Sequence, residues 1–188
     1  MPTANKIKYG ISKCYYAKKS AGGTYGTPVA LPGAVSISLS PQGENYVFYA
    51  DNIKYYRNAV NNGYEGTLEV ALLPDDFLKD ILENSLDSTD KVLVEEVKNA
   101  SVEFALGFQV EGDGYNPRFW FYNCTATRPE VSGDTKEDSI EAQTEELTIS
   151  TTPGTDGYVR ARTTADTPSG TYDDWFEDVW FPPTPSTT

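Results

Sequence analysis

The 188-residue sequence contains no histidine, and it has only two cysteines and one methionine. Histidine is the commonest general base and metal ligand in proteins, so its absence excludes catalytic triads and zinc sites that depend on imidazole. The two cysteines, Cys14 and Cys124, are far apart and form no CxxC pattern. We therefore expect two buried thiols in a reducing compartment rather than a disulfide, and no metal or other cofactor.

Positive charge is also scarce, because 15 Lys and Arg face 28 Asp and Glu and leave a formal charge of −13. A chain this acidic repels phosphate backbones, which argues against tight nucleic-acid binding. No apolar run reaches the length of a transmembrane helix, and the first ten residues contain no apolar signal region. We expect a protein that is made and kept in a cytoplasm and does not enter a membrane.

Alternation of apolar and polar residues dominates what is present. It is clearest in residues 35–40, 67–72 and 101–111, and period two is typical of strands with one face on a core and one polar face. Turn-forming residues separate 101–111 from 118–128, which predicts a long hairpin. In the first strand the apolar parity changes, and a bulge near Ser12-Lys13 would explain the change.

The stretch "FWFYNCTATRP", residues 119–129, is apolar on both faces at its beginning. Strict alternation places Trp120, Tyr122, Cys124 and Ala126 on one side of a strand. Its other side begins with Phe119 and Phe121 and then becomes polar. We interpret Trp120 as a core residue that shares its face with Cys124 and Ala126.

One helix is expected at residues 74–84. Pro74 suits the first turn, Asp75 and Asp76 suit the positive end of the helix dipole, and the apolar stripe includes Phe77 and Ile81. The predicted fold class is therefore all-β with one short helix, a β-sandwich or barrel with that helix packed on it.

Two regions fit this compact unit poorly. Residues 41–66 form a long stretch rich in Gly, Asn and aromatic side chains, and connections of this length are uncommon unless they are functional. Either it packs on its own subunit, or it is an arm that binds a neighbour; we favour the arm, because Tyr is enriched at interfaces. The candidate contact residues are Tyr46, Phe48, Tyr49, Tyr55, Tyr56 and Tyr64.

The second region is the C-terminal tail. We divide the chain into a domain at residues 1–163 and a tail at 164–188, in which a linker precedes an acidic and aromatic segment. Its candidate docking residues, expected to lie on a subunit surface, are Trp175, Phe176, Trp180 and Phe181. The tail tryptophans and Trp120 could alternatively form a platform that stacks against sugars.

Adjacent carboxylates occur at Glu95-Glu96 and Glu145-Glu146. Neighbours on a strand point to opposite faces, so these pairs are interpreted as solvated surface rather than as acid and base of an active site. We do not expect an enzyme.

Several segments together resemble one family. They are "NKIKYGISKCYYAKK", "TYGTPVALPGAVSISLSPQGE", "FYADNIKYY", "NNGYEGTLEVALLPDDF", "YNCTATRPEVSGDTKEDSIEAQTEELTI" and "WFEDVWF". Taken in order they cover nearly the whole chain, and they resemble the major tail protein family of long-tailed phages, or siphophages, that infect Gram-positive bacteria. "FYADN" followed by "NNGYEG" and "PDDF" is the most distinctive part of the resemblance.

The resemblance implies a β-sandwich of the phage tail tube type with a flanking helix and a long extended loop. Six subunits would form a ring whose inner sheets join into a barrel, and rings would stack on a tape measure protein between tail end proteins. DNA would pass through the lumen only in transit. The protein would then be synthesised in the host cytoplasm and located in the virion tail tube.

Polar strand faces could line such a lumen, and the candidates are Glu69, Glu103 and Gln109. A negative pore would repel DNA phosphates and prevent sticking. The alternative function, from a different class, is a monomeric β-sandwich binding module that recognises cell-wall glycan or protein through its exposed aromatic side chains.

Overall fold

The computed structural model describes residues 4–43, 45–133, 135 and 142–183; within this range the side chains of 45, 46 and 57–59 are left out. The described chain is mostly β, with 42% of residues in strands and 8% in helices. The all-β class is therefore confirmed.

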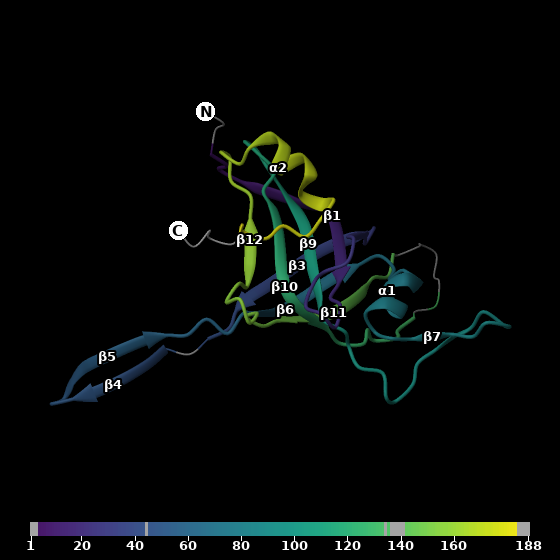
Figure 1. The fold of residues 1–188 in the computed structure, drawn as a ribbon, viewed down its shortest axis with the longest axis horizontal. Helices are drawn as coiled ribbons and strands as arrows, with labels where there is room; N and C mark the ends of the chain where they lie inside the picture. The colour runs from purple at the N-terminus through teal and green to yellow at the C-terminus, as the bar shows by residue number, and fades with distance from the viewer. Residues whose placement is uncertain (1–3, 44, 134, 136–141, 184–188) are drawn as a thin grey trace.

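Most strands join one antiparallel sheet in the order β2-β1-β9-β10-β11-β6-β3, and β12 pairs with β10 (Figure 1). These strands are β1 (Lys8–Lys18), β2 (Val29–Ala30), β3 (Ala34–Pro41), β6 (Tyr64–Val70), β9 (Phe104–Gly112), β10 (Arg118–Ala126), β11 (Glu145–Thr151) and β12 (Arg160–Arg162). Two further pairs stand apart from it, namely β4 (Asn45–Ala50) with β5 (Ile53–Ala59), and β7 (Ser85–Leu86) with β8 (Leu93–Val94).

The sheet divides at β10. The first part of β10 pairs with β12, whereas its last residues pair with β11. The strands next to β11 in the sheet order, β6 and β3, therefore turn away from β9. In Figure 1, β9 and β10 cross β3 and β6 at a steep angle. The strand at the far end of the path, β3, nevertheless contacts β1. The sheet thus folds over a single main core.

Buried side chains from both parts of the sheet meet in this core. They include Cys14, Tyr16, Leu68, Val70, Phe104, Leu106, Phe121, Cys124, Leu147 and Ile149. Phe104 and Leu106 lie on the expected apolar face of the predicted hairpin, and the pairing of Phe108 with Phe119 confirms that β9 and β10 form it. Both cysteines are buried free thiols, as predicted.

The predicted helix is present as α1 (Asp75–Asp80), shorter than the 74–84 range. Pro74 precedes it, and Phe77 and Ile81 are fully buried in the main core. The expectation of one helix is wrong, however. The C-terminal segment contains α2 (Ser169–Asp173) and the 3₁₀ helix η1 (Asp174–Phe176), which the spacing of its apolar residues did not reveal.

Two bulges decide which side chains face the core. The predicted bulge in β1 is confirmed, because the register with β9 shifts between Ser12 and Tyr15 and Lys13 has a positive φ of 51°. A second, unpredicted shift lies in β10 between Phe121 and Cys124. It reverses the alternation, so the prediction that Trp120 and Cys124 share a face is wrong: Cys124 joins the main core, and Trp120 lies on the opposite face.

Candidate assembly surfaces

The strands β4 and β5 form a two-stranded arm that projects from the body of the molecule (Figure 1). Their turn, Asp51-Asn52, has positive φ at both residues, 51° and 62°, which is the geometry of a tight two-residue hairpin turn. The prediction of a loop at 41–66 is therefore corrected to a regular hairpin whose stem begins in β3 and ends in β6.

Large side chains along the arm are open to solvent. The exposed fractions are 48% for Phe48, 58% for Tyr49, 62% for Ile53, 70% for Tyr55 and 54% for Tyr56. An isolated two-stranded hairpin is at best marginally stable, and contiguous exposed apolar side chains mark interaction sites. The arm is built in a way that suits burial against another surface.

One of the candidate arm residues, Tyr64, is placed differently. Tyr64 belongs to β6 at the base, where its ring packs edge-on against Phe121 at 5.3 Å and under the Arg160 guanidinium at 5.3 Å. It is therefore part of the body, and the assignment to the arm is corrected. The backbone of Tyr46 pairs with Asn58 in the arm, and the side chain lies outside the described atoms.

Backbone geometry fixes the base of the arm. The ladder between β3 and β6 continues through Gln42, whose N–H donates to Gly63 O at 2.9 Å and whose oxygen accepts from Asn62 N at 2.9 Å. Gly63 has φ +98°, and a Cβ there would lie 1.9 Å from Thr151 O. Only glycine fits this junction, so the arm leaves the sheet at a defined point.

The arm also differs from the body in charge. Residues 45–60 contain Lys54, Arg57 and Asp51, a sum of 2 − 1 = +1. The rest of the chain then carries −13 − 1 = −14. The arm and the body therefore carry net charges of opposite sign.

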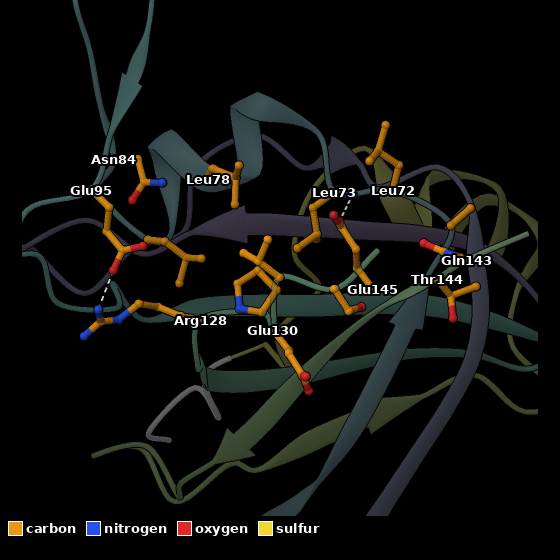
Figure 2. Close-up of a pocket in the computed structure, with 15 residues that line it drawn as sticks. Leu72, Leu73, Leu78, Asn84, Glu95, Arg128, Glu130, Gln143, Thr144 and Glu145 are labelled. Atoms are coloured by element: carbon orange, nitrogen blue, oxygen red, sulfur yellow. Dashed lines mark hydrogen bonds and ion pairs between the residues drawn. The ribbon is translucent and has the colours of Figure 1, made fainter. Parts of the chain in front are cut away.

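A pocket of about 420 Å³ lies beside α1, between the end of β6 and the chain that follows β10 (Figure 2). Leucines 72, 73, 78 and 82 line it, and Arg128 pairs with Glu95 at its edge. Glu145 accepts a hydrogen bond from Leu73 N at 2.6 Å. Leucines and polar side chains therefore line the pocket together, and its two bonded carboxylates, Glu95 and Glu145, have separate partners and do not converge as an acid and a base.

Only Glu145 and Glu146 are strand neighbours, at the start of β11; Glu95 and Glu96 follow β8 and lie outside any strand, so the assumption of a strand there is corrected. Glu95 pairs with Arg128, whereas Glu96 pairs with Lys98 at 2.8 Å. Glu145 turns to Leu73 N, whereas Glu146 lies opposite Glu69 in the pairing of β11 with β6. Neither pair brings two carboxylates onto one reacting bond.

The outer face of β3, β6 and β11 is a polar sheet surface. Strand register places its residues in three rows across the three strands: Ser36-Glu69-Glu146, Ser38-Thr67-Thr148 and Ser40-Glu65-Ser150. We call these nine residues the hydroxyl-carboxylate face. It contains three carboxylates and no Lys or Arg among its nine members.

Glu69 is anchored within this face. Its carboxylate accepts hydrogen bonds from the Thr144 hydroxyl at 2.6 Å and the Ser36 hydroxyl at 2.9 Å. Both bonds lower the pKa of Glu69, and the bond from Thr144 has the larger effect. They favour the ionised form of the carboxylate, because both hydroxyls donate to it.

The three lumen candidates do not share one surface. Glu103 lies just before β9, beside Lys19, with Nζ and Oε2 2.5 Å apart. Gln109, within β9, is only 4% exposed, between Ser12 Oγ at 3.3 Å and Arg118 Nε at 3.0 Å. Gln109 therefore lines no open surface of the described chain, and the assumption that its strand face looks at solvent is corrected.

The C-terminal docking candidates pack on the chain's own sheet. Trp175 is 3% exposed, and its carbonyl accepts a hydrogen bond from Trp120 Nε1 at 2.9 Å. Phe176 stacks on Tyr15, with ring centroids 4.7 Å apart. The residues of this second cluster are Ala17, Ala105, Trp120, Tyr122 and Trp175, joined by Tyr15, Tyr25, Ala161, Phe176, Val179 and Trp180.

Ring contacts hold the C-terminal segment against the sheet at both of its ends. The Arg118 guanidinium lies 3.8 Å from the Tyr172 ring centroid and also donates to Tyr172 O. At the other end, Phe181 stacks on Tyr122 at 4.6 Å while remaining 37% exposed. The sequence singled out these docking residues but did not identify the surface that they meet, although the two apolar faces at the start of β10 were its signal.

Other site types find no support among the described residues. No group of three or more Cys, Asp or Glu is placed to hold a metal ion, and no described helix is long and apolar enough to cross a membrane.

No protein-family model matches the chain, and no curated protein matches it.

Proposed function

We propose that this protein is a structural subunit that polymerises into the tail tube of a long-tailed phage. The observation that carries the proposal is the arm: a regular, net-positive hairpin with five large exposed side chains, on a body of charge −14. A subunit that folds alone has no use for such a surface, whereas a stacked ring buries it against the next copy.

The assembly takes its form from the resemblance. Six subunits form a ring with a continuous inner barrel, and rings stack along a tape measure protein between tail end proteins. The free edge of β3 supports this form, because an unpaired edge strand can join a neighbouring sheet. The tube sits in the virion, conducts DNA without binding it specifically, and performs no catalysis.

The lumen is better assigned to the hydroxyl-carboxylate face than to Glu103. That face has three carboxylates and no cation in its rows, whereas Glu103 is neutralised by Lys19. A surface with ionised carboxylates and short hydroxyl side chains repels phosphate and offers it no positive anchor. Glu69 and Glu65 would then face the passing DNA, together with Glu146.

The arm supplies the test of assembly. Replacing Phe48, Tyr49, Tyr55 and Tyr56 with Ser removes exposed aromatic surface that has no ring contact in the described chain. We expect the variant to fold but not to form rings or tubes, since each buried aromatic contact contributes on the order of 2 kcal/mol or more. Negative-stain microscopy at high protein concentration measures assembly, and circular dichroism measures folding.

A matched control replaces exposed apolar residues elsewhere, Val92, Val94 and Val97, which are 54%, 44% and 100% exposed. Because Val92 and Val94 lie in or beside the β7–β8 pair, this variant removes apolar surface without touching the arm. Normal tubes from the arm variant would contradict the assignment. A wild-type protein that remains monomeric and binds cell-wall glycan would instead support the binding module.

A further inference from the structure

Asn123 occupies an unusual place in β10. It lies in the second bulge, with a positive φ of 47°, and is only 6% exposed. Asn tolerates this backbone conformation better than most residues, which accounts for the residue type. It does not account for the three functional groups gathered around its side chain.

Two donors converge on the Asn123 amide oxygen. Lys19 Nζ lies 2.6 Å from Oδ1, and the Tyr25 hydroxyl donates to the same oxygen at 3.0 Å. The amide nitrogen donates in turn to Thr152 O at 3.4 Å. Since ammonium and phenol groups are donors here, these contacts fix which amide atom is the oxygen, and the Lys19 nitrogen lies beside the carbonyl group.

A carboxylate completes the group. Glu103 Oε2 lies 2.5 Å from Lys19 Nζ, and the backbone holds the two residues together through Lys19 N, which donates to Glu103 O at 2.8 Å. An amine, an acid and an amide carbonyl from three separate chain segments therefore meet at one point.

We propose that Lys19 and Asn123 join in an intramolecular isopeptide bond that the folded chain forms by itself. Glu103 accepts a proton from the Lys19 ammonium, and the free amine attacks Asn123 Cγ. The carbonyl electron pair moves to Oδ1, where the Tyr25 hydroxyl stabilises the negative charge. When the pair returns, the Cγ–Nδ2 bond breaks, and Nδ2 leaves as ammonia with the proton from Glu103.

The second proton on the Lys19 nitrogen passes to the departing ammonia through Glu103, so the products are a secondary amide and one ammonium ion. No oxidant or other reactant is consumed. The chain loses one positive charge and one nitrogen with its hydrogens.

Fixed orientation favours the reaction, because groups held in contact react as if at very high local concentration. The side chains of Lys19 and Glu103 are only 24% and 46% exposed, which helps to keep them in contact. Burial raises the pKa of Tyr25 to about 12, so its phenol remains a hydrogen-bond donor. Departure of ammonia makes the step irreversible, and the product accumulates.

The bond would tie the chain just beyond β1 to β10 across the intervening β9, closing a loop between positions 104 apart in sequence. A covalent link of that span restricts the unfolded chain and resists pulling along the sheet. This property belongs to the subunit and does not depend on tube formation.

Intact-mass spectrometry of the full chain tests the proposal. After incubation at mildly alkaline pH, we expect the wild-type mass to fall below the sequence mass by one ammonia. Tryptic digestion should yield a branched peptide that joins Lys19 to Asn123. Lys19→Arg and Asn123→Gly should retain the full mass, and Gly suits the positive φ at position 123.

Matched variants separate this bond from other chemistry. Lys18→Arg changes the exposed neighbouring lysine and should lose ammonia as the wild type does. Glu103→Gln keeps its shape and should slow the loss on the order of a hundredfold or more. Circular dichroism confirms that each variant is folded.

Two results would overturn the proposal. One is a folded wild-type protein that keeps its full sequence mass. The other is an ammonia loss that persists in Lys19→Arg, which would assign it to cyclisation of the Asn123 backbone instead.

Discussion

Single residues fix the junctions of this protein. Gly63 allows the arm to leave the sheet, and Asn123 and Lys13 hold the two bulges in left-handed backbone conformations. Gly63 and Asn123 also have close neighbours, so substitutions at these two positions should lower the free energy of unfolding more than a change at an ordinary strand position.

Gly63→Ala tests the junction directly. Its Cβ would meet Thr151 O at 1.9 Å in a backbone conformation that disfavours side chains, and we expect a loss of about 2–4 kcal/mol in unfolding free energy. Urea denaturation followed by fluorescence measures it. Gly157→Ala is the control, because that glycine also has positive φ, +79°, but nothing within 4 Å; it should cost about 1 kcal/mol. Equal losses would show that the close contact at Gly63 relaxes freely.

Buried acidic protons should make the protein sensitive to alkali. Burial raises the pKa of Cys14 from 9.0 to about 12 and that of Tyr25 from 10.0 to about 12, and it also raises the pKa of Tyr16 and Tyr122. At a pH between the ordinary pKa of such a group and its raised pKa in the folded protein, the unfolded chain has released a proton that the folded chain retains. The free energy of unfolding therefore falls as pH rises above about 9, and is unaffected by these groups below it.

The urea midpoint at pH 8, 10 and 11 provides the measurement. Tyr16→Phe removes one of the phenols, together with its hydrogen bond to Asp80 at 3.1 Å, and should make the decline shallower. A midpoint that stays constant from pH 8 to pH 11 would be inconsistent with the raised pKa values.

At the scale of elements, the C-terminal segment acts as a second layer over β1, β9, β10 and β12. It gives the apolar side chains Trp120 and Tyr122 a partner on the face opposite the main core. The segment therefore contributes to the stability of the fold, although it contains only α2, η1 and irregular chain.

Trp175 is the anchor of this layer. Trp175→Ala should cost about 3–5 kcal/mol, since it opens a cavity beside Trp120 and Trp180. Trp175→Phe should cost much less, because the buried Trp175 Nε1 has no hydrogen-bond partner within the described chain and Phe removes that donor. The partly exposed Phe181 gives the control, and Phe181→Ala should cost about 1 kcal/mol. Thermal unfolding of the three variants ranks them, and a harmless Trp175→Ala would show that the layer is dispensable.

At the scale of the whole molecule, charge is divided between an anionic body and a cationic arm. Repetition in a ring would multiply any change on the hydroxyl-carboxylate face. Under the tail tube proposal, Glu69→Lys alters a six-fold ring by roughly twelve charges, within reach of DNA in a narrow lumen, since screening acts over about 8–10 Å.

Phage that carry Glu69→Lys should assemble tails of normal length and release DNA slowly at low salt, with recovery at higher salt. Ejection kinetics at two ionic strengths measure this. Glu69→Gln removes the charge without adding a cation and separates altered hydrogen bonding to Ser36 and Thr144 from attraction of phosphate. Glu130→Lys makes the same charge change at the pocket beside α1 and should eject normally. Wild-type kinetics for Glu69→Lys would remove this face from the lumen.

The sequence alone determined the features that depend on local pattern. Period-two alternation identified the all-β class and the β9–β10 hairpin, and the parity change in the first strand located its bulge. The proline, acidic pair and apolar stripe at 74–82 identified α1. The aromatic residues of 41–66 singled out the arm, although the strand pairing within it was not foreseen.

Only the tertiary structure decided what each strand face meets. Alternation says that Gln109 and Trp120 lie on given sides of their strands, but Gln109 contacts Ser12 and Arg118 of the two neighbouring strands, and Trp120 is covered by the C-terminal segment, which follows far later in the chain. The bulge at Asn123 depends on Tyr25 and Lys19, also distant in sequence, whose donors satisfy its buried amide. Local periodicity reflects the backbone of one element, whereas burial depends on contacts between elements, and a single strand carries no record of its partner.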